Sequence, residues 1–384
     1  MKVAVLGYGT VGAGVYSMLS DAPGMEAGPV LVRPGKEVES FMVSDAALIF
    51  GDPTVDAVVE TLGGLDPAYS YGMRALEAGK HFITANKAMV AAHGLELAAL
   101  AREKGAAFLF SAACGGGVPF LHNLALSAET DRIEAVSGIL NGTTNYMLDA
   151  MQRRGLSYGD ALREAQSLGY AESDPTADVS GLDALRKMQL ACAVAFGVLP
   201  QSGMLCEGME HFTAADVEDI QSRGLVCRLM ARGSRAGESV SAYVEPVLFP
   251  RAAPESSVFT NNNMARYTGK RCGSIVLMGQ GAGRFPTASA VLRDLSAAQQ
   301  GARSMFPENC RAAEADNREA VHSYYIRTGG FAAVRLSLRS VLAQGEVVRA
   351  VTEPMSAEKM HALAQNIRKD GNDLFFAALE EELC

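Results

Sequence analysis

Short apolar runs alternate with amphipathic stretches through the first part of the chain. The apolar runs predict strands at 3–6, 30–32, 57–60, 81–84 and 107–110. Helical spacing between them predicts helices at 13–19, 69–78 and 94–104. Strands that alternate with helices in this way form a parallel sheet covered by helices on both faces. We therefore expect an α/β fold with a doubly wound parallel sheet over residues 1–117.

A different pattern follows, in which strands and helices no longer alternate regularly. Strands are predicted at 132–139, 225–231, 239–246 and 274–278, and a helix at 146–154. We expect residues 118–280 to form an α+β domain for substrate binding and dimerisation. A glycine-rich loop at 279–284 precedes a helix that runs to residue 295. This suggests that residues 281–305 return to the first domain.

The C-terminal region predicts a separate small module, after a polar, linker-like stretch at 307–317. Its pattern predicts strands at 323–327, 347–352 and 374–379, and helices at 332–342 and 357–369. This β-α-β-α-β unit over residues 318–384 carries no obvious set of catalytic side chains. We therefore expect it to regulate the protein or to support oligomers.

The composition is that of a globular protein, with 48% hydrophobic and 20% charged residues. A net charge of −9 argues against nucleic acid or an anionic membrane surface as the main partner. The longest apolar run, at 188–199, is too short to span a bilayer. Seven scattered cysteines without a CxxC pair fit reduced thiols and a cytoplasmic location better than disulfides or a zinc site.

The sequence GYGTVG follows the first predicted strand and precedes a predicted helix. Gly7 suits a tight turn, Gly9 lets the backbone approach a pyrophosphate, and Gly12 lets the helix pack close to the strand. The N-terminus of that helix then faces the phosphates. In this context the motif predicts a Rossmann-type dinucleotide site.

The end of the second predicted strand indicates which dinucleotide binds. NAD sites usually carry an acidic residue there for the ribose hydroxyls. Here the strand ends at Arg33, with Lys36 close by. An arginine pairs with a 2′-phosphate and stacks on flat rings, which favours NADP(H) over NAD(H). The alternative is that Arg33 is a solvated loop charge.

Two further features lie at the ends of predicted strands. Lys87 follows the strand at 81–84, at the edge where such sheets bind ligands. The strand at 107–110 runs into Ser111 and the turn CGGGVP at 114–119. The main-chain carbonyls of this turn suit a hard cation, or the turn is a linker between domains. Cys114 is chemically able to act as a nucleophile, but no matching histidine signature accompanies it.

The most informative segment is GYAESDPTADVSGLDALRK, at 169–187. Asp174 precedes a proline, which disfavours helix and makes the first half a loop. The second half predicts a helix, with Asp183 and Lys187 one turn apart on the same face. Spacing alone leaves two alternatives. The segment is either a capped surface helix with an ion pair, or a site that holds a zwitterionic substrate and handles a proton.

Taken in order, six motifs resemble the homoserine dehydrogenase family over nearly the whole chain. They are GYGTVG at 7–12, TANK at 84–87, GGGVP at 115–119, GILNGTTNY at 138–146, the acidic segment, and GAGRFPTASAV at 281–291. The resemblance implies NAD(P)-dependent interconversion of L-aspartate 4-semialdehyde and L-homoserine, in threonine and methionine biosynthesis. It also implies a homodimer or a higher homo-oligomer. The tail resembles an ACT domain, an amino-acid-sensing module.

The resemblance implies roles for individual residues. Lys187 is similar to the family's proton donor to the carbonyl oxygen, and Lys87 to its second essential lysine. Glu172 would bind the substrate ammonium, and Asp178 and Asp183 would complete the polar site. The remaining implied contacts are Thr10, Val11, Gly169, Gly281, Gly283 and Lys87 with cofactor, and main-chain oxygens of Ser111, Cys114, Gly116 and Val118 with a sodium ion. Thr143 lies in the small polar stretch after the strand at 132–139, which is suited to offer hydroxyls and backbone N–H groups to a substrate carboxylate.

Departures from the family pattern leave further alternatives open. The glycine turn usually begins with glutamate and here begins with Ser111, which removes a charge. The tail has room for one strand fewer than an ACT domain, so a threonine sensor and a dimerising remnant are both compatible with it. Two other functions are an acylating dehydrogenase that forms a thioester on Cys114 and a non-catalytic amino-acid sensor.

Overall fold

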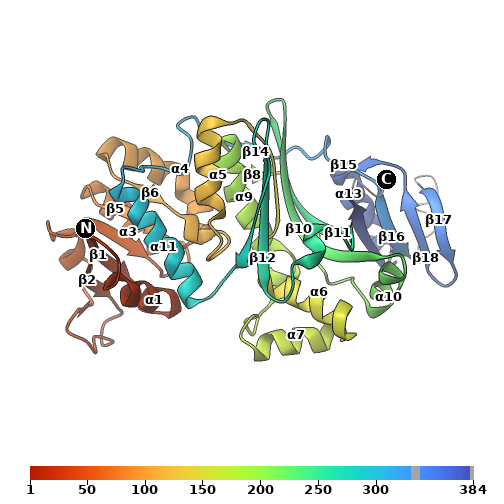
Figure 1. Cartoon of the computed structure of the whole chain (residues 1–384), viewed down its shortest axis with the longest axis horizontal. Coiled ribbons are helices and arrows are strands. Elements are labelled where there is room, and N and C mark those ends of the chain that lie inside the picture. Colours follow the sequence, from red (N-terminus) through yellow and green to blue (C-terminus); the bar gives the residue numbers. More distant parts are fainter. Residues whose placement is uncertain (330–337, 381–384) are drawn as a thin grey trace.

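The protein is built around two large sheets, which lie side by side along its long axis (Figure 1). A computed structural model describes residues 1–329 and 338–380. The N-terminal part, in red and orange, forms one end of the molecule, and the blue tail forms the other. Buried residues from both sheets contribute to one apolar core, and the second sheet also packs against the tail in a separate apolar cluster.

The first sheet is parallel throughout. Its strands follow the order β3-β2-β1-β4-β5-β6, so the order reverses between β1 and β4. Doubly wound sheets with this order bind dinucleotides at the reversal. The strands are β1 (Lys2–Leu6), β2 (Glu26–Leu31), β3 (Met42–Val43), β4 (Ala57–Glu60), β5 (His81–Thr84) and β6 (Phe108–Leu109). The predicted doubly wound parallel sheet is confirmed.

Helices from two distant parts of the sequence cover this sheet. Four follow its strands and one comes from much later: α1 (Thr10–Leu19), α2 (Ala47–Phe50), α3 (Ala68–Glu77), α4 (Lys87–Lys104) and α11 (Arg284–Gln299). α11 lies against α1 so closely that a Cβ on Gly14 would be 2.9 Å from Arg284 Cγ. Ser304 then pairs with Phe108 beside β6.

The GYGTVG turn has the geometry that its glycines suit. Gly7 has a φ of +97°, a conformation that glycine adopts without strain. A Cβ on Gly12 would lie 2.1 Å from Gly7 O, so only glycine lets α1 pack this closely against the turn.

The second sheet is mixed and continues from the middle of the molecule into the tail. Its order is β13-β12-β7-β10-β11-β20-β16-β18-β17, with β9 beside β11. β11 and β20 pair in parallel through Val247 with Ala378 and Leu248 with Leu379. The strands are β7 (Ile133–Ile139), β9 (Leu205–Cys206), β10 (Leu225–Ala236), β11 (Ser239–Pro250), β12 (Asn262–Gly269), β13 (Gly273–Gln280), β16 (Tyr324–Thr328), β17 (Leu338–Gln344), β18 (Val348–Thr352) and β20 (Leu374–Leu379).

Helices and short strands complete the middle of the molecule. The long helix α9 packs on the sheet, where a Cβ on Gly233 would lie 2.6 Å from Cys192 Sγ. The helical segments are η1 (Ser111–Ala113), α5 (Phe120–Thr130), α6 (Gly142–Arg154), α7 (Tyr158–Ser167), α8 (Thr176–Val179), α9 (Leu182–Phe196), α10 (Ala214–Ser222) and η2 (Pro254–Ser257). Two separate strand pairs are β8 (Val198–Ser202) with β14 (Arg311–Glu314), and β15 (Val321–His322) with β19 (Met355–Ser356).

The tail differs from its predicted pattern. The predicted helix at 332–342 is wrong over 338–342, which belong to strand β17, and residues 332–337 lie outside the described part of the chain. β17 pairs antiparallel with β18, and such pairing overrides a local helical pattern. The expectation that the tail lacks one strand was therefore also wrong. Helix α13 (Ala357–Lys369) agrees with its predicted bounds.

Candidate active site

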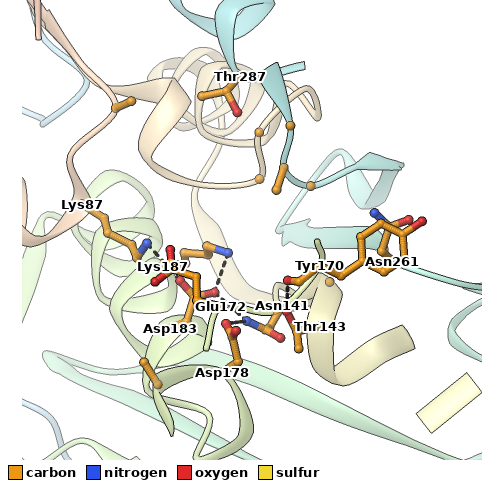
Figure 2. A pocket seen from close by; sticks show the side chains of 18 of the residues that line it. Lys87, Asn141, Thr143, Tyr170, Glu172, Asp178, Asp183, Lys187, Asn261 and Thr287 are labelled. Carbon is orange, nitrogen blue, oxygen red and sulfur yellow. Dashed lines mark hydrogen bonds and ion pairs between the residues drawn. The ribbon is translucent and has the colours of Figure 1, made fainter. Parts of the chain in front are cut away.

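A cavity of about 600 Å³ lies between the carboxyl ends of the first sheet and the helices of the middle region (Figure 2). Its walls come from six separate segments: the corner after β5, the glycine turn after β6, the start of α6, the acidic segment, the loop before β12 and the loop before α11. The structure brings together most of the residues that the sequence predicted for substrate and proton transfer, namely Lys87, Thr143, Glu172, Asp178, Asp183 and Lys187.

Two helices that carry the lysines begin at this cavity. α4 begins at Lys87 itself, and the Asn86 side chain caps it by accepting from Met89 N at 3.1 Å. α9 begins at Leu182, so Asp183 and Lys187 lie one turn apart as predicted. Their side chains are only 13% and 11% exposed, which excludes the alternative of a solvated surface pair.

The Asp183 carboxylate bridges both lysines. Its Oδ2 accepts from Lys187 Nζ at 2.7 Å, and its Oδ1 lies 3.0 Å from Lys87 Nζ. Lys187 Nζ also donates to Leu140 O at 2.6 Å. Because an ammonium has three N–H donors, Lys187 retains one donor for a ligand in the cavity.

These contacts decide the charge of Lys187. Burial lowers the pKa of this amine, but the charge and the hydrogen bond of Asp183 raise it more, so the pKa lies above its usual value. Burial raises the pKa of the Asp183 carboxyl, and the two lysines bring that pKa well below its usual range. The pair is therefore an ammonium and a carboxylate at neutral pH.

The other predicted substrate residues present oxygen atoms to the cavity. Thr143 Oγ1 donates to Tyr170 O at 2.6 Å, and this residue lines the cavity. Asp178 reaches the cavity from α8. Glu172 is exposed at the wall, and no residue of the described chain donates a hydrogen bond to its carboxylate. Acceptors of this kind suit an ammonium group.

A second cavity, of about 800 Å³, lies where the strand order of the first sheet reverses. Gly7, Gly9, Arg33 and Lys36 line it, and none of its described lining residues is acidic. Thr10 and Val11 begin α1 directly after Gly9. The other predicted cofactor contacts, Gly169, Gly281 and Gly283, line the first cavity instead.

Two family models match the chain. Residues 119–296 match homoserine dehydrogenase, and residues 7–111 match the homoserine dehydrogenase NAD binding domain. The homoserine dehydrogenase of Synechocystis sp. is 38% identical over 313 residues, which cover 77% of this chain and 72% of the relative. The chain belongs to the homoserine dehydrogenase family. Members of this family are oxidoreductases, and the chain has both their NAD-binding and their catalytic domain.

Solved homoserine dehydrogenases share the fold. A crystal structure from Thiobacillus denitrificans has a TM-score of 0.87 at 30% identity, covering 99% of this chain and 98% of that chain. A homoserine dehydrogenase of S. aureus has a TM-score of 0.77 at 26% identity and covers 99% of both chains. A hyperthermophilic archaeal homoserine dehydrogenase in complex with NADPH, at 24% identity and a TM-score of 0.67, covers 81% of this chain and 99% of that chain.

The placement of Cys114 argues against the thioester mechanism that its presence made conceivable. The thiol is fully buried, and burial raises its pKa to about 12. A thiol that stays protonated is a poor nucleophile. Membership of the homoserine dehydrogenase family and the intact lysine pair likewise exclude the non-catalytic sensor.

The glycine turn of this homoserine dehydrogenase fold is fastened to the loop before α11. A Cβ on Gly116 would lie 2.5 Å from Gly281 C, and Gly117 N donates to Gln280 O at 3.0 Å. Ser111, in the position of the family's glutamate, bonds to Asp294 of α11 through its N–H (2.8 Å) and its hydroxyl (2.5 Å). Within the described residues there is no His, Cys, Asp and Glu cluster that suits a metal ion, and no described helix is long and apolar enough to cross a membrane.

The lining residues that the sequence prediction missed include two asparagines. Asn141 donates to Asp178 Oδ1 at 2.7 Å and to Asp183 Oδ2 at 2.9 Å. It lies in GILNGTTNY, so the signal was present, but spacing does not show where its side chain points. Asn261 reaches the first cavity from the loop before β12, and no sequence pattern indicated it.

Proposed function

We propose that Lys187 donates a proton to the carbonyl oxygen when L-aspartate 4-semialdehyde is reduced to L-homoserine. A reduced nicotinamide, when bound, supplies the hydride to the carbonyl carbon. Negative charge then builds on the oxygen, and the buried ammonium of Lys187 stabilises this charge and transfers its proton. The observation that carries the proposal is the bridge from Asp183, which keeps Lys187 protonated at the cavity wall.

The substrate's own charges fit the remaining side chains. Glu172, Asp178 and the Thr143 oxygen accept from the substrate ammonium. Lys87 shares the Asp183 carboxylate from its other oxygen and keeps a second positive charge beside the reacting groups. In the reverse direction, Lys187 without its proton accepts the hydroxyl proton of L-homoserine.

The test follows NADPH consumption with L-aspartate 4-semialdehyde in the absence of phosphate. We expect Lys187→Met to lose about 10²- to 10⁴-fold in kcat, the usual contribution of a general acid, and to bind NADPH with unchanged Kd. Lys104→Met, at the exposed end of α4, is the matched control and retains activity. Wild-type kcat in Lys187→Met would remove Lys187 from the role of proton donor.

We propose that the chain prefers NADP(H) over NAD(H). Arg33 and Lys36 place positive charge in the second cavity, where NAD sites place an acid. The archaeal neighbour's complex with NADPH supports the same cofactor. We expect Arg33→Ala to lower the ratio of kcat/KM for NADPH to that for NADH by at least tenfold, whereas the exposed control Arg163→Ala leaves it unchanged. An unchanged ratio in Arg33→Ala contradicts the proposal.

We propose that protein groups, rather than a sodium ion, fasten the glycine turn. The four oxygens of the implied ion site include Ser111 O and Val118 O, which already accept from Cys114 N (3.2 Å) and Phe120 N (2.7 Å). The Arg293 guanidinium donates to Gly117 O at 3.2 Å, and its positive charge opposes a cation in the same turn. These residues fit sodium poorly. Equal melting temperatures in sodium chloride and choline chloride at one ionic strength are expected, and a specific gain in sodium overturns the proposal.

We propose a homodimer that forms through the open face of the second sheet. Along β12 and β13 this face presents Arg266, Thr268 and Ser274 with the exposed apolar residues Val276 and Met278, which are 42% and 60% exposed. Light scattering checks the dimer, which Met278→Glu should weaken. A wild type that is monomeric at micromolar concentration contradicts it.

We propose that the chain divides into three domains: 1–117 together with 281–305, then 118–280, and then 318–384. A cytoplasmic location remains a prediction.

A further inference from the structure

Asn141 occupies the N-cap of α6 and is only 4% exposed. Its Oδ1 accepts from Thr144 N at 2.8 Å and from Thr144 Oγ1 at 3.0 Å. Because the cap needs an acceptor at this position, the orientation of the carboxamide is fixed. Its Nδ2 must therefore point away from the helix, toward the acidic segment.

Both N–H groups of this amide meet carboxylates of the candidate active site (Figure 2). One donates to Asp178 Oδ1 at 2.7 Å and the other to Asp183 Oδ2 at 2.9 Å. The same Asp183 oxygen accepts from Lys187 Nζ. Asn141 thus links the carboxylate that controls Lys187 to the carboxylate that faces the substrate ammonium.

We propose that Asn141 is a positioning residue that keeps Asp178 and Asp183 ionised side by side and aims Asp183 at the lysines. This inference rests on the function proposed above and adds a residue to it. Two neighbouring carboxylates oppose each other's ionisation, and hydrogen bonds to the charged form favour it. Asn141 supplies one such bond to each, without adding a charge.

The surroundings of Asp178 make this donor important. Burial and the charge of Asp183 raise the pKa of the Asp178 carboxyl, whereas the hydrogen bond from Asn141 and the charge of Lys187 lower it. The charged or titratable side chains that line the cavity around it are Lys87, Tyr170, Glu172, Asp174, Asp183, Arg186 and Lys187. Without the amide, the effects that raise the pKa face less opposition, and Asp178 takes up a proton at a higher pH.

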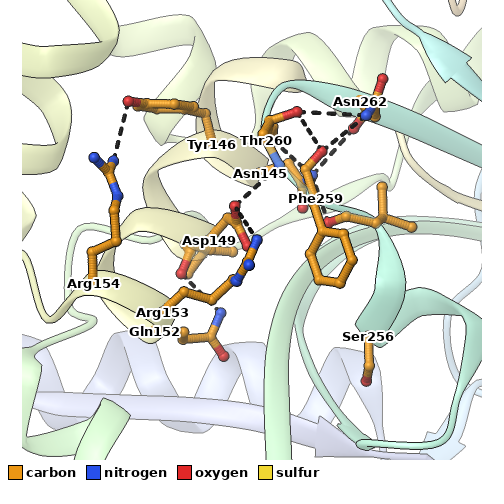
Figure 3. A network of polar contacts seen from close by, with 12 residues as sticks. Asn145, Tyr146, Asp149, Gln152, Arg153, Arg154, Ser256, Phe259, Thr260 and Asn262 are labelled. Atoms are coloured by element: carbon orange, nitrogen blue, oxygen red, sulfur yellow. Dashed lines mark hydrogen bonds and ion pairs between the residues drawn. The ribbon is translucent and has the colours of Figure 1, made fainter.

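Helix α6 is itself held in place, so Asn141 has a fixed base (Figure 3). One turn along, Asn145 Nδ2 donates to Val258 O, Thr260 O and Asn262 O at 2.9 to 3.2 Å. Asp149 Oδ2 accepts from Thr260 N at 3.1 Å. Thr260 has a φ of +57°, which is unusual for a β-branched residue. These bonds tie α6 to the loop that carries Asn261 into the same cavity.

The test compares Asn141→Ser with the wild type through the pH dependence of kcat/KM. Serine keeps a capping oxygen and lacks both amide donors, so the helix start is retained. We expect the acid limb of the profile to shift to higher pH by about one unit. At pH values below the limb, this shift lowers kcat/KM by about tenfold. At alkaline pH most of the activity returns. Asn141→Asp, which also keeps the cap and adds a third carboxylate, should shift the limb at least as far.

Ser157→Ala is the matched control, because Ser157 caps α7 through Asp160 N and lies on another helix. It should lower stability slightly and leave the pH profile unchanged. A uniform loss of kcat/KM at every pH in both Asn141 variants, with the acid limb in place, would show a merely structural role and overturn the inference. The proposed function has its own test: it is contradicted if Lys187→Met keeps the wild-type kcat, whatever the pH profiles of the Asn141 variants.

Discussion

At the residue scale, Asp183 forms ion pairs with both lysines in the cavity. Its spacing to Lys187 could be predicted, because an i,i+4 relation follows from helix geometry alone. The charge of Lys187 could not, because burial and a nearby carboxylate shift the pKa of an amine in opposite directions. Only the distances from Asp183, 2.7 Å to Lys187 and 3.0 Å to Lys87, decide between the two effects.

The buried thiol of Cys114 gives a prediction at the same scale. We expect Cys114→Ser to retain close to wild-type kcat, because a thiol with a pKa of about 12 supplies no thiolate at neutral pH. A serine hydroxyl is small enough for the site and can donate to Lys187 O as the thiol does. The measurement is kcat for L-aspartate 4-semialdehyde without phosphate. Complete loss of activity in a folded variant would revive the thioester mechanism.

At the element scale, the two glycine-rich loops act as one unit. Gly116 has a φ of +52°, and a Cβ there would lie 2.5 Å from Gly281 C. We expect Gly116→Ala to lower the melting temperature and to raise KM for the cofactor, because the alanine pushes the Gly281 loop out of the cavity wall. The left-handed backbone alone costs an alanine about 1–2 kcal/mol.

Gly105→Ala separates these two effects. Gly105, at the end of α4, also has a positive φ, of +65°, but a Cβ on it would have no atom of another residue within 4 Å beyond its own chain neighbours and helix. The variant should lose stability by the backbone cost and keep the wild-type KM. If Gly116→Ala and Gly105→Ala behave alike, the contact between the two loops has no functional weight.

The elements also show how far the sequence predicts this fold. β4 and β5 were predicted to the residue, because a continuous apolar run identifies a strand buried on both faces. β12 was missed, because NNMARYTG has no apolar run, and its place depends on pairing with β7 and β13. β17 was also missed, because its own pattern resembles a helix. Only its pairing with β18 makes it a strand.

At the scale of the whole molecule, strands of the tail continue the second sheet. Ion pairs accompany the β11–β20 junction on both sides. Arg232 of β10 bonds to Glu380 at 2.6 Å, and Arg368 of α13 bonds to Glu207 at 2.6 Å. The sequence could not reveal these pairs, because the partners are more than a hundred residues apart. The tail is therefore bound to the middle of the molecule by these ion pairs as well as by strand pairing.

His322, in β15 of the tail, contacts Tyr243 of β11, with 2.7 Å between His322 Nε2 and Tyr243 Oη. Burial, with help from the charge of Arg232, lowers the pKa of this imidazole to about 4. The unfolded chain, in which the pKa is near its ordinary value of about 6.5, binds the proton more readily. The contribution of His322 to the free energy of unfolding is therefore fully present above about pH 6.5 and is lost as the pH falls toward 4.

We expect this loss to reach on the order of 2 kcal/mol at pH 5, because the folded state must exclude a proton that the unfolded state accepts. His322→Gln keeps a polar partner for Tyr243 and does not titrate, so its melting temperature should fall less between pH 7.5 and pH 5. His93→Gln, at the surface of α4, is the control and should follow the wild type. If the melting temperature of His322→Gln falls as much as that of the wild type over this range, other groups cause the loss of stability in acid, and the titration of His322 does not.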